Sequence, residues 1–260
     1  MAYDTLLVER DGGVTTITLN RPDSLNALNI AMSDDFVHAM QQARQDDGTR
    51  AVVLTGSGRA FCAGGDVRSS GPRRSVAEEH SYILRLARVV HEIVNLEKPV
   101  IGMVNGVAVG AGCNIALACD IVIASEEAKF SEIFVRIGLI PDLGGLFLLP
   151  RLVGLHKAKE IIFSGDMVLA REAERIGMIN QAVPAADLCD VTMALAHRLA
   201  NGPTKAIGLA KALLHRALAT DLAGAVELEA LGQSILMQTE DHKEGVRAFL
   251  DKRQPQFKGR

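Results

Sequence analysis

Residues 99–123 form the stretch that most constrains the fold of this chain. An apolar run of strand length at 100–104 leads through an Asn-Gly turn signal to three small residues at 110–112, and then to a helical run from Cys113. A second apolar strand is expected at 121–124. A strand that turns through small residues into a helix points unpaired backbone N–H groups at one place, and the helix dipole adds positive charge there. This pattern favours binding of an anion, or of an oxygen that becomes negative during a reaction.

The glycines of this stretch also have a simpler interpretation, in which they only let a helix pack closely against a sheet. They do not form a dinucleotide fingerprint, because no third glycine completes G-x-G-x-x-G, and no Gly-Lys-Ser/Thr of a P-loop follows. Residues 51–67 repeat the pattern, with an apolar strand, a glycine turn and an elbow of small residues at 63–66. We call residues 63–66 the first elbow and residues 110–112 the second elbow. Two such elbows would place one N–H each on a single oxygen.

The composition excludes several classes of partner. Of the 260 residues, 48% are hydrophobic and 23% are charged, and the formal net charge is −3. We therefore expect one large domain or a core with an appendage, and no nucleic-acid or membrane partner. The four cysteines form no Cys-x-x-Cys pair and the seven histidines show no metal-ligand spacing, so we expect free thiols and no metal. No signal peptide or membrane span is visible, and we expect a cytoplasmic protein.

The order of the predicted elements indicates an α/β fold. Apolar runs and alternating patterns predict strands at 5–10, 14–20, 51–55, 100–104, 121–124 and 178–183. Helical spacing predicts helices at 30–45, 76–96, 113–118, 156–163 and 170–176. From 187 to 252 the pattern is helical throughout, with breaks at 202–203 and near 221. The early alternation implies a mostly parallel sheet covered by helices, followed by an all-helical C-terminal part.

The catalytic motifs that the chain lacks narrow its chemistry. It contains no G-x-S-x-G nucleophile elbow and no H-E-x-x-H zinc motif. The two elbows thus offer stabilisation of an oxyanion without an obvious nucleophile or metal. That combination suits enolate chemistry on a carbonyl compound, in which a positioned carboxylate moves protons.

Several motifs then occur in a fixed order along the chain. They are Asn20-Arg21-Pro22, Leu25-Asn26-Ala27-Leu28, RAFCAGGD at 59–66, the stretch 99–123, Gly138-Leu139-Ile140-Pro141-Asp142, and a tail with EGVRAFL at 244–250 and PQF at 255–257. Together they resemble the enoyl-CoA hydratase/isomerase (crotonase) superfamily, from the first strand to the tail. Within it, the likeness is greatest to the branch that isomerises ring-1,2-epoxyphenylacetyl-CoA.

This resemblance implies a spiral of ββα units, with a core at 1–200 and a helical oligomerisation region at 201–260 that forms trimers or dimers of trimers. It implies an acyl-CoA substrate, with coenzyme A as part of the substrate and no other cofactor. By position, the N–H groups of Gly65 and Ala111 would form the oxyanion hole. Further residues would contact the substrate or its CoA part, the last of them in a neighbouring subunit: Ala27, Ala63, Asp66, Val67, Phe134 and Lys258.

Departures from the family pattern decide the expected reaction. Hydratases of the family use two glutamates, but here alignment on the elbow places Asn114 at the first position, and alignment on Gly138 places Phe134 at the second. Glu132 lies two residues before Phe134 and would share its face if that segment were extended, but its spacing from Gly138 argues against a catalytic role. Asp142 occupies a position that resembles the proton-shuttling aspartate of family isomerases, and apolar neighbours would raise its pKa.

We therefore predict an acyl-CoA isomerase in which Asp142 moves a proton and thereby shifts a double bond or reorganises an epoxide. Asp142 also has the simpler interpretation of a turn residue after proline. Three alternatives stay open: a hydratase in which Asp142 or Glu132 holds the water, a non-catalytic acyl-CoA-binding protein, and, more remotely, a dehalogenase. The sequence leaves the acyl group open, and with it the choice between phenylacetate degradation and fatty acid metabolism.

Overall fold

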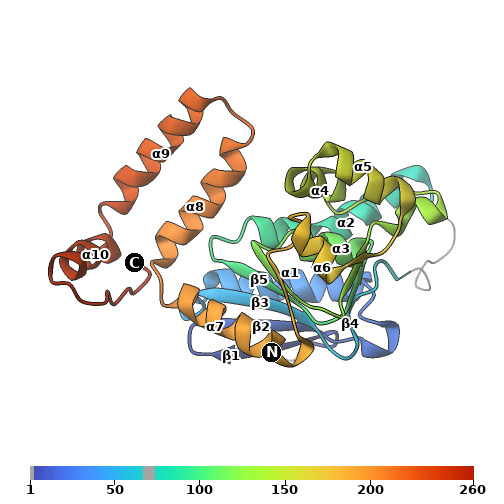
Figure 1. The fold of residues 1–260 in the computed structure, drawn as a ribbon, viewed down its shortest axis with the longest axis horizontal. Helices are drawn as coiled ribbons and strands as arrows, with labels where there is room; N and C mark the ends of the chain where they lie inside the picture. The colour runs from blue at the N-terminus through green and yellow to red at the C-terminus, as the bar shows by residue number, and fades with distance from the viewer. Residues whose placement is uncertain (1–2, 67–73) are drawn as a thin grey trace.

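The computed structural model describes residues 3–66 and 74–260 (Figure 1). The strands are β1 Leu6–Asp11, β2 Val14–Leu19, β3 Ala51–Gly56, β4 Ala60–Cys62, β5 Val100–Val104, β6 Val107–Val109, β7 Ile121–Ser125, β8 Lys129–Ser131, β9 Val168–Leu169 and β10 Gln181–Val183. The α-helices are α1 Ile30–Gln45, α2 Val76–Val94, α3 Ala111–Leu117, α4 Gly145–Val153, α5 Leu155–Ser164, α6 Ala170–Arg175, α7 Leu188–Ala200, α8 Thr204–Ala217, α9 Leu222–Leu236 and α10 Glu240–Leu250. Short 3₁₀ helices occupy Pro22–Ser24 (η1), Ile133–Ile137 (η3) and Ala185–Asp187 (η4).

The strands form two sheets, where the sequence predicted one. A six-stranded sheet has the order β1-β2-β3-β5-β7-β10, and all its pairs are parallel except β1 with β2. A four-stranded sheet has the order β4-β6-β8-β9, with only β8 and β9 antiparallel. Because β4 and β6 pair in parallel, with Cys62 opposite Ala108, their carboxyl ends lie together. The segments that follow β4 and β6 are the two glycine elbows, so this pairing brings the elbows side by side.

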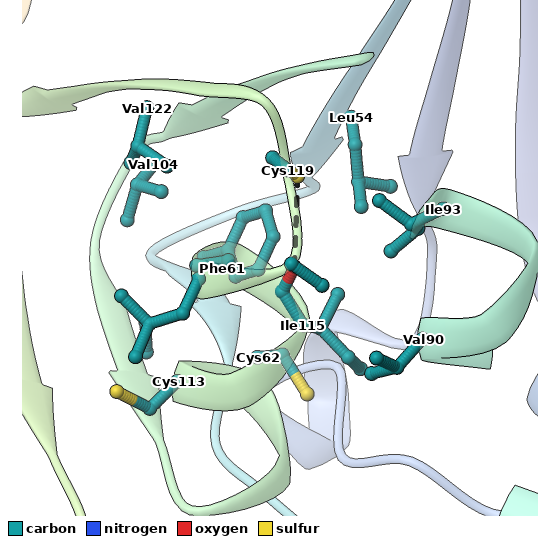
Figure 2. Close-up of a cluster of buried hydrophobic side chains, with 14 of the residues drawn as sticks. Leu54, Phe61, Cys62, Val90, Ile93, Val104, Cys113, Ile115, Cys119 and Val122 are labelled. Carbon is teal, nitrogen blue, oxygen red and sulfur yellow. Dashed lines mark hydrogen bonds between the residues drawn. The ribbon is translucent and has the colours of Figure 1, made fainter. Parts of the chain in front are cut away.

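The apolar runs of the sequence become the core behind these elbows. Phe61 and Cys62 of β4 and Ile115 of α3 are at most 1% exposed, and they pack with Val90 and Ile93 of α2 (Figure 2). Burying each large apolar side chain contributes about 1.5–3 kcal/mol relative to leaving it in water. This packing fixes α3 against β4 and so fixes the elbow from which α3 begins.

Caps explain where the two long helices begin. The Asn29 side chain accepts a hydrogen bond of 2.9 Å from the Met32 N–H at the start of α1, as the sequence predicted. At the start of α2, Ser75 and Glu78 form a reciprocal capping box. Each cap satisfies amide groups that would otherwise lack a partner and contributes about 1 kcal/mol.

Some elements differ from the prediction in their bounds. Helix α4 was not predicted, because its glycines and Pro150 mask a short apolar helix. Strand β10 begins at Gln181 rather than 178, since Met178 and Ile179 turn into the core. Helix α3 begins at Ala111, two residues before the predicted start, and a break at 237–239 divides the C-terminal helices once more than expected.

Helices α8 and α9 extend away from the sheets as an antiparallel pair (Figure 1). A buried ion pair connects α8 to the core: Lys211 Nζ lies 2.8 Å from the Asp120 carboxylate and donates to the Ile93 carbonyl at 2.7 Å. Removing one partner of such a pair typically costs about 3–5 kcal/mol, because it leaves a buried charge uncompensated. Among the described residues, no helix is both long enough and apolar enough to cross a membrane.

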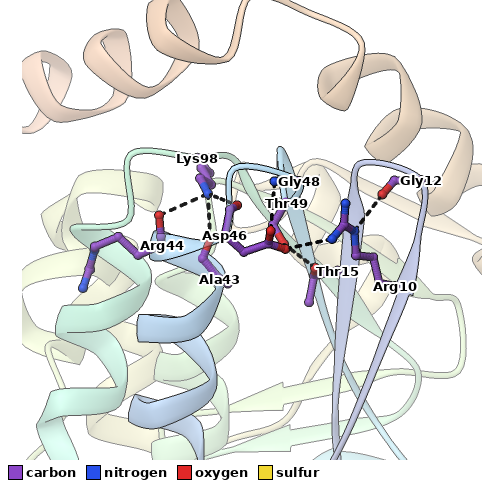
Figure 3. Close-up of polar contacts among 9 residues, drawn as sticks. All are labelled: Arg10, Gly12, Thr15, Ala43, Arg44, Asp46, Gly48, Thr49 and Lys98. Carbon is purple, nitrogen blue, oxygen red and sulfur yellow. Dashed lines mark hydrogen bonds and ion pairs between the residues drawn. The ribbon is translucent and has the colours of Figure 1, made fainter. Parts of the chain in front are cut away.

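A polar cluster lies where α1 ends and β3 is about to begin (Figure 3). We call it the Asp46 cluster; it consists of Arg10, Asp46, Gly48, Thr49 and Lys98. The Asp46 carboxylate accepts from the Gly48 N–H at 3.0 Å, from the Thr49 hydroxyl at 2.8 Å and from Arg10 at 3.1 Å. Lys98 donates to the carbonyls of Ala43 and Arg44 in the last turn of α1 and to that of Asp46, the residue after the helix.

Candidate active site

The two elbows approach each other so closely that side chains would not fit between them. Gly64 and Gly110 both have positive φ, of 105° and 53°. A Cβ on Gly64 would lie 3.0 Å from the Val109 carbonyl oxygen and 3.9 Å from the Ala111 nitrogen. A Cβ on Gly112 would lie 2.1 Å from the Cys62 carbonyl oxygen. Gly64 and Gly112 are thus required for close backbone approach, which is the packing interpretation of the sequence.

Two backbone N–H groups at the elbows are left without a hydrogen-bond acceptor in the described part of the chain. Neither the Gly65 N–H nor the Ala111 N–H has a hydrogen-bond acceptor among the residues that the structure describes. Their neighbours are satisfied, since Asp66 N–H donates to Leu28 O and Gly110 N–H donates to Ser131 O, each at 2.8 Å. Ala111 is the first residue of α3, where the helix dipole adds positive charge. Both amides are therefore available to a hydrogen-bond acceptor from outside the described chain.

Arg21 connects the first elbow to the segment that contains Ala27. Its guanidinium forms an ion pair of 2.8 Å with Asp66 and donates to the Ala27 carbonyl. Backbone bonds join the same segments, from Ala63 N–H to Leu25 O at 3.0 Å and from Leu28 N–H to Gly64 O at 2.7 Å. The structure thus brings the predicted contact residues Ala27, Ala63 and Asp66 together beside Gly65. Val67 lies outside the described residues.

Asp142 lies in a turn whose backbone is held by its neighbours. The Asp142 carbonyl accepts from the Gly145 N–H at 2.9 Å, and Leu143 adopts a left-handed conformation with φ of 44°. The Asp142 side chain is half-buried, and burial raises its pKa to about 6. This is the direction that the apolar neighbours predicted. Its Oδ1 atom is buried and has no partner among the described residues.

Asp142 belongs to a cluster of polar side chains that are buried or half-buried. We call it the Asp142 cluster; it consists of Cys113, Asn114, Glu132 and Asp142. The Asn114 carboxamide donates to the Asp142 carbonyl at 2.9 Å and makes a longer contact of 3.5 Å with Glu132 Oε2. The Cys113 thiol also interacts with the Glu132 carboxyl group and opposes the rise of its pKa. Burial first, and then the charge of Asp142, raise the pKa of Glu132 to about 7.

Unpartnered polar atoms concentrate in this cluster. In the described part of the chain, five buried side-chain N or O atoms lack a hydrogen-bond partner, and three of them are Asn114 Oδ1, Glu132 Oε1 and Asp142 Oδ1. A buried polar atom without a partner costs about 1–3 kcal/mol, so native proteins keep few of them. Their concentration here marks a place suited to a polar ligand or water.

Glu132 and Phe134 do not share the face that an extended segment would have given them. Glu132 is the N-cap residue of the 3₁₀ helix η3, so the two side chains do not follow the alternation of a strand. Phe134 is 8% exposed, and its Cζ atom lies 3.5 Å from where a Cβ on Gly110 would be. Phe134 therefore covers the second elbow with an aromatic ring, and Glu132 is fully buried beside Asn114.

Lys258 is not brought to the other predicted residues within one chain. Its backbone N–H donates to Asp241 at 2.6 Å, in a tail that packs beside Arg50 and Thr204. The C-terminus lies near α8 and α10, away from α3 and α4 (Figure 1). A contact of Lys258 with a neighbouring subunit's CoA stays a prediction.

The sequence alone did not identify two features of the site. Asn114 was recognised only as the replacement for a glutamate, although it holds the backbone of the Asp142 turn. Arg21 was recognised only as part of a motif, although it bridges Ala27 and Asp66. The isolated glutamate in the apolar run KFSEIFV was the available signal that Glu132 is buried.

Comparison with known proteins identifies the family of this chain. The family model for enoyl-CoA hydratase/isomerase matches residues 9–260. The chain is 42% identical to a Rhodobacter capsulatus protein named "probable enoyl-CoA hydratase", over all of both chains. It is 41% identical to the 1,2-epoxyphenylacetyl-CoA isomerase of Escherichia coli, over 98% of each. The crystal structure of an enoyl-CoA hydratase from Mycobacterium smegmatis superposes with a TM-score of 0.93 at 35% identity, covering 97% of this chain and 98% of that one. The chain therefore belongs to the enoyl-CoA hydratase/isomerase family and has its crotonase fold.

Proposed function

We propose that this enzyme is an acyl-CoA isomerase in which Asp142 is the proton shuttle. The observation that supports this most is the Asp142 carboxyl group, which has a raised pKa and an unpartnered Oδ1. Asn114, which holds the Asp142 turn, lies on the helix that begins at the Ala111 amide. A base with a pKa near the working pH transfers protons efficiently.

In the proposed reaction, the Gly65 and Ala111 amides donate to the thioester carbonyl oxygen of an acyl-CoA. The ionised Asp142 then removes a proton from a carbon near the thioester. The C–H electron pair moves toward the carbonyl and forms an enolate, whose negative oxygen the two amides stabilise. Asp142 returns the proton to a different carbon, so that a double bond shifts or an epoxide ring reorganises. Losing one oxyanion donor would slow such a step about 10²–10³-fold.

The reaction so described needs no metal or redox cofactor, and coenzyme A enters as part of the substrate. The relative that is a 1,2-epoxyphenylacetyl-CoA isomerase supports an arylacetyl thioester as one substrate class, and a 3-enoyl-CoA is the other. The first class would place the enzyme in phenylacetate degradation and the second in fatty acid metabolism.

Hydrogen–deuterium exchange tests this proposal. We expect the wild-type protein to exchange protons of a 3-enoyl-CoA or an arylacetyl-CoA with heavy water and to migrate the double bond of the former. Asp142→Asn should slow both processes about 10²–10⁴-fold, which is the usual contribution of a general base. Asp46→Asn, which changes an aspartate outside the site, should leave exchange unchanged. Wild-type binding without exchange of either thioester would contradict the proposal.

Hydration of an enoyl-CoA is the second candidate. It is favoured by the second carboxyl group, Glu132, whose charge interacts with Asp142, and by the hydratase named among the relatives. In this reaction the two carboxyl groups would hold and activate a water molecule. Hydration of crotonyl-CoA that is lost in Asp142→Asn would favour this candidate, whereas tight binding of CoA thioesters without any turnover would indicate a non-catalytic binding protein.

We also propose that helices α8 and α9 assemble copies of this chain into a trimer or a dimer of trimers. Leu214 of α8, Leu218 directly after α8, and Leu222, Val226 and Leu231 of α9 are each more than half exposed. Exposed apolar area of this kind marks an interface. Mass measurement in solution tests this, and Leu214→Asp with Leu222→Asp should give monomers.

The free thiols Cys62, Cys113 and Cys119 are buried, which supports a reducing compartment such as the cytoplasm.

A further inference from the structure

Glu132 is an ionisable group that the proposed reaction does not use. It is 0% exposed, at the junction between β8 and η3. The Cys113 thiol and the Asn114 carboxamide reach its carboxyl group from α3, and Oε1 has no partner among the described residues. An isolated buried carboxylate is costly, so a buried acid either finds a cation or keeps its proton.

No cation faces this carboxyl group in the described part of the chain. The only charged group that acts on it is Asp142, from the turn before α4, and that charge is negative. On the η3 side, Arg136 pairs with Asp166 at 2.7 Å in solvent. On the β8 side, Lys129 is exposed. The two neighbours on α3 are uncharged. Asn114 is a neutral amide, and burial raises the pKa of the Cys113 thiol well above its usual value, so the thiol keeps its proton.

Asn114 connects the two acids. Its carboxamide nitrogen contacts Glu132 on one side and donates to the Asp142 carbonyl on the other. Gly145 leaves room for this carboxamide, because a Cβ there would lie 2.6 Å from both Asn114 Nδ2 and Oδ1. Movement of the Glu132 carboxyl group would therefore move the amide that supports the Asp142 turn.

We propose that Glu132 is a positioning residue that works in its neutral form: its carboxyl group fixes the Asn114 carboxamide beneath the Asp142 turn, and its retained proton leaves Asp142 as the only negative charge of the Asp142 cluster. This rests on the proposed function, in which Asp142 is the base. Ionised Glu132 would add a second negative charge close to the position of the developing enolate and would oppose its formation.

The pH profile of kcat/KM for proton exchange tests the role of the proton. In the wild type, exchange should rise as Asp142 ionises around pH 6 and fall as Glu132 ionises above about pH 7. Glu132→Gln is neutral at every pH and has nearly the same shape. It should keep the rising limb and lose the falling one, exceeding the wild type by about tenfold or more at pH 9 when each is scaled to its rate at pH 6.5. Glu127→Gln, the same change at an exposed position, should follow the wild type.

Two outcomes of this profile would overturn the inference. One is a Glu132→Gln profile that falls above pH 7 as the wild type does, since the falling limb then belongs to another group. The other is a folded Glu132→Gln protein that is inactive at every pH, since Glu132 would then have to transfer a proton itself.

Infrared spectroscopy separates this inference from the proposed function, because it needs neither turnover nor a Glu132 variant. In Asp142→Asn, a neutral-carboxyl band from Glu132 should be present near pH 5 and should titrate at a lower pH than in the wild type, because the charge of Asp142 is gone. If that band titrates as expected but no thioester exchanges protons, the proposed function fails, whereas the inference that Glu132 keeps its proton is supported. If exchange occurs but the band is absent, the inference about Glu132 fails.

Discussion

Asp46, directly after α1, and Asp142, in the turn before α4, show how the same side chain can either hold a loop or remain available to a ligand. In the Asp46 cluster, the carboxylate accepts three hydrogen bonds, and both of its oxygens have partners. In the Asp142 cluster, one carboxyl oxygen is buried without a partner, and the neighbouring Glu132 and Asn114 each have an unpartnered oxygen. The first arrangement holds a loop in place, and the second leaves hydrogen-bonding capacity for something outside the protein.

The pKa values of the two aspartates move accordingly. Hydrogen bonds from Thr49 and Gly48 lower the pKa of Asp46, whereas burial raises the pKa of Asp142 to about 6. A lowered pKa means that the folded state stabilises the charged form, and a raised pKa means that it destabilises it. The Asp142 cluster therefore reduces stability at neutral pH, as expected where a site is prepared for a ligand rather than for the folded chain alone.

Glu132→Gln should produce the largest change in stability. The folded-state pKa of Glu132 is about 7, against 4.5 for an ordinary glutamate, so the folded state binds the proton more tightly than the unfolded state does. The wild type is most favoured below pH 4.5 and loses stability as the pH rises through 7. Relative to the wild type, Glu132→Gln should gain roughly 2.5 kcal/mol in free energy of unfolding between pH 5 and pH 8. Urea unfolding at the two pH values measures this, and a constant difference would show that Glu132 ionises normally.

Gly145→Ala should have the next largest effect. The added Cβ would lie 2.6 Å from the Asn114 carboxamide and would displace it from the Asp142 carbonyl. We expect a loss of about 2 kcal/mol in the free energy of unfolding and slower proton exchange. Gly245→Ala is the matched control, because its Cβ would meet the Phe257 ring at an ordinary distance of 3.5 Å within helix α10. Unimpaired exchange in Gly145→Ala would mean that Asn114 does not support the Asp142 turn.

The contrast between the two clusters also explains how much the sequence could predict. Patterns with a local cause were read correctly: the Asn29 cap, the β1–β2 hairpin, and the apolar runs that became β3, β5 and β7. The elbows could be recognised because glycine is the residue that tolerates their close approach. The partners of Glu132 could not be found, because they come from α3 and from the turn before α4, and because the segment that follows Glu132 is a 3₁₀ helix rather than a strand.

Asp142→Asn should change stability less than Gly145→Ala does. It should raise the free energy of unfolding although it lowers activity. The folded-state pKa of about 6 lies above the 3.8 of an ordinary aspartate, so the wild type loses stability as the pH rises through this range. The asparagine variant carries no charge and avoids that loss. Because the side chain is only half-buried, solvent screens the effect, and we expect a gain of about 1 kcal/mol at pH 8 that disappears near pH 3. A variant that is both inactive and less stable at pH 8 would indicate a structural role for the carboxylate.

Asp46→Asn should have the smallest effect, and its sign should be reversed. Its carboxylate has a lowered pKa, so the stability that it contributes is present above the usual aspartate pKa and is lost as the pH falls through the lower folded-state value. The side chain is 43% exposed, and we expect a cost below about 1 kcal/mol at pH 7 that becomes smaller at pH 3. Proton exchange should be unchanged. If the cost at pH 3 equals that at pH 7, the charge of Asp46 contributes nothing, and the difference between the two aspartates depends on hydrogen-bond geometry rather than on ionisation.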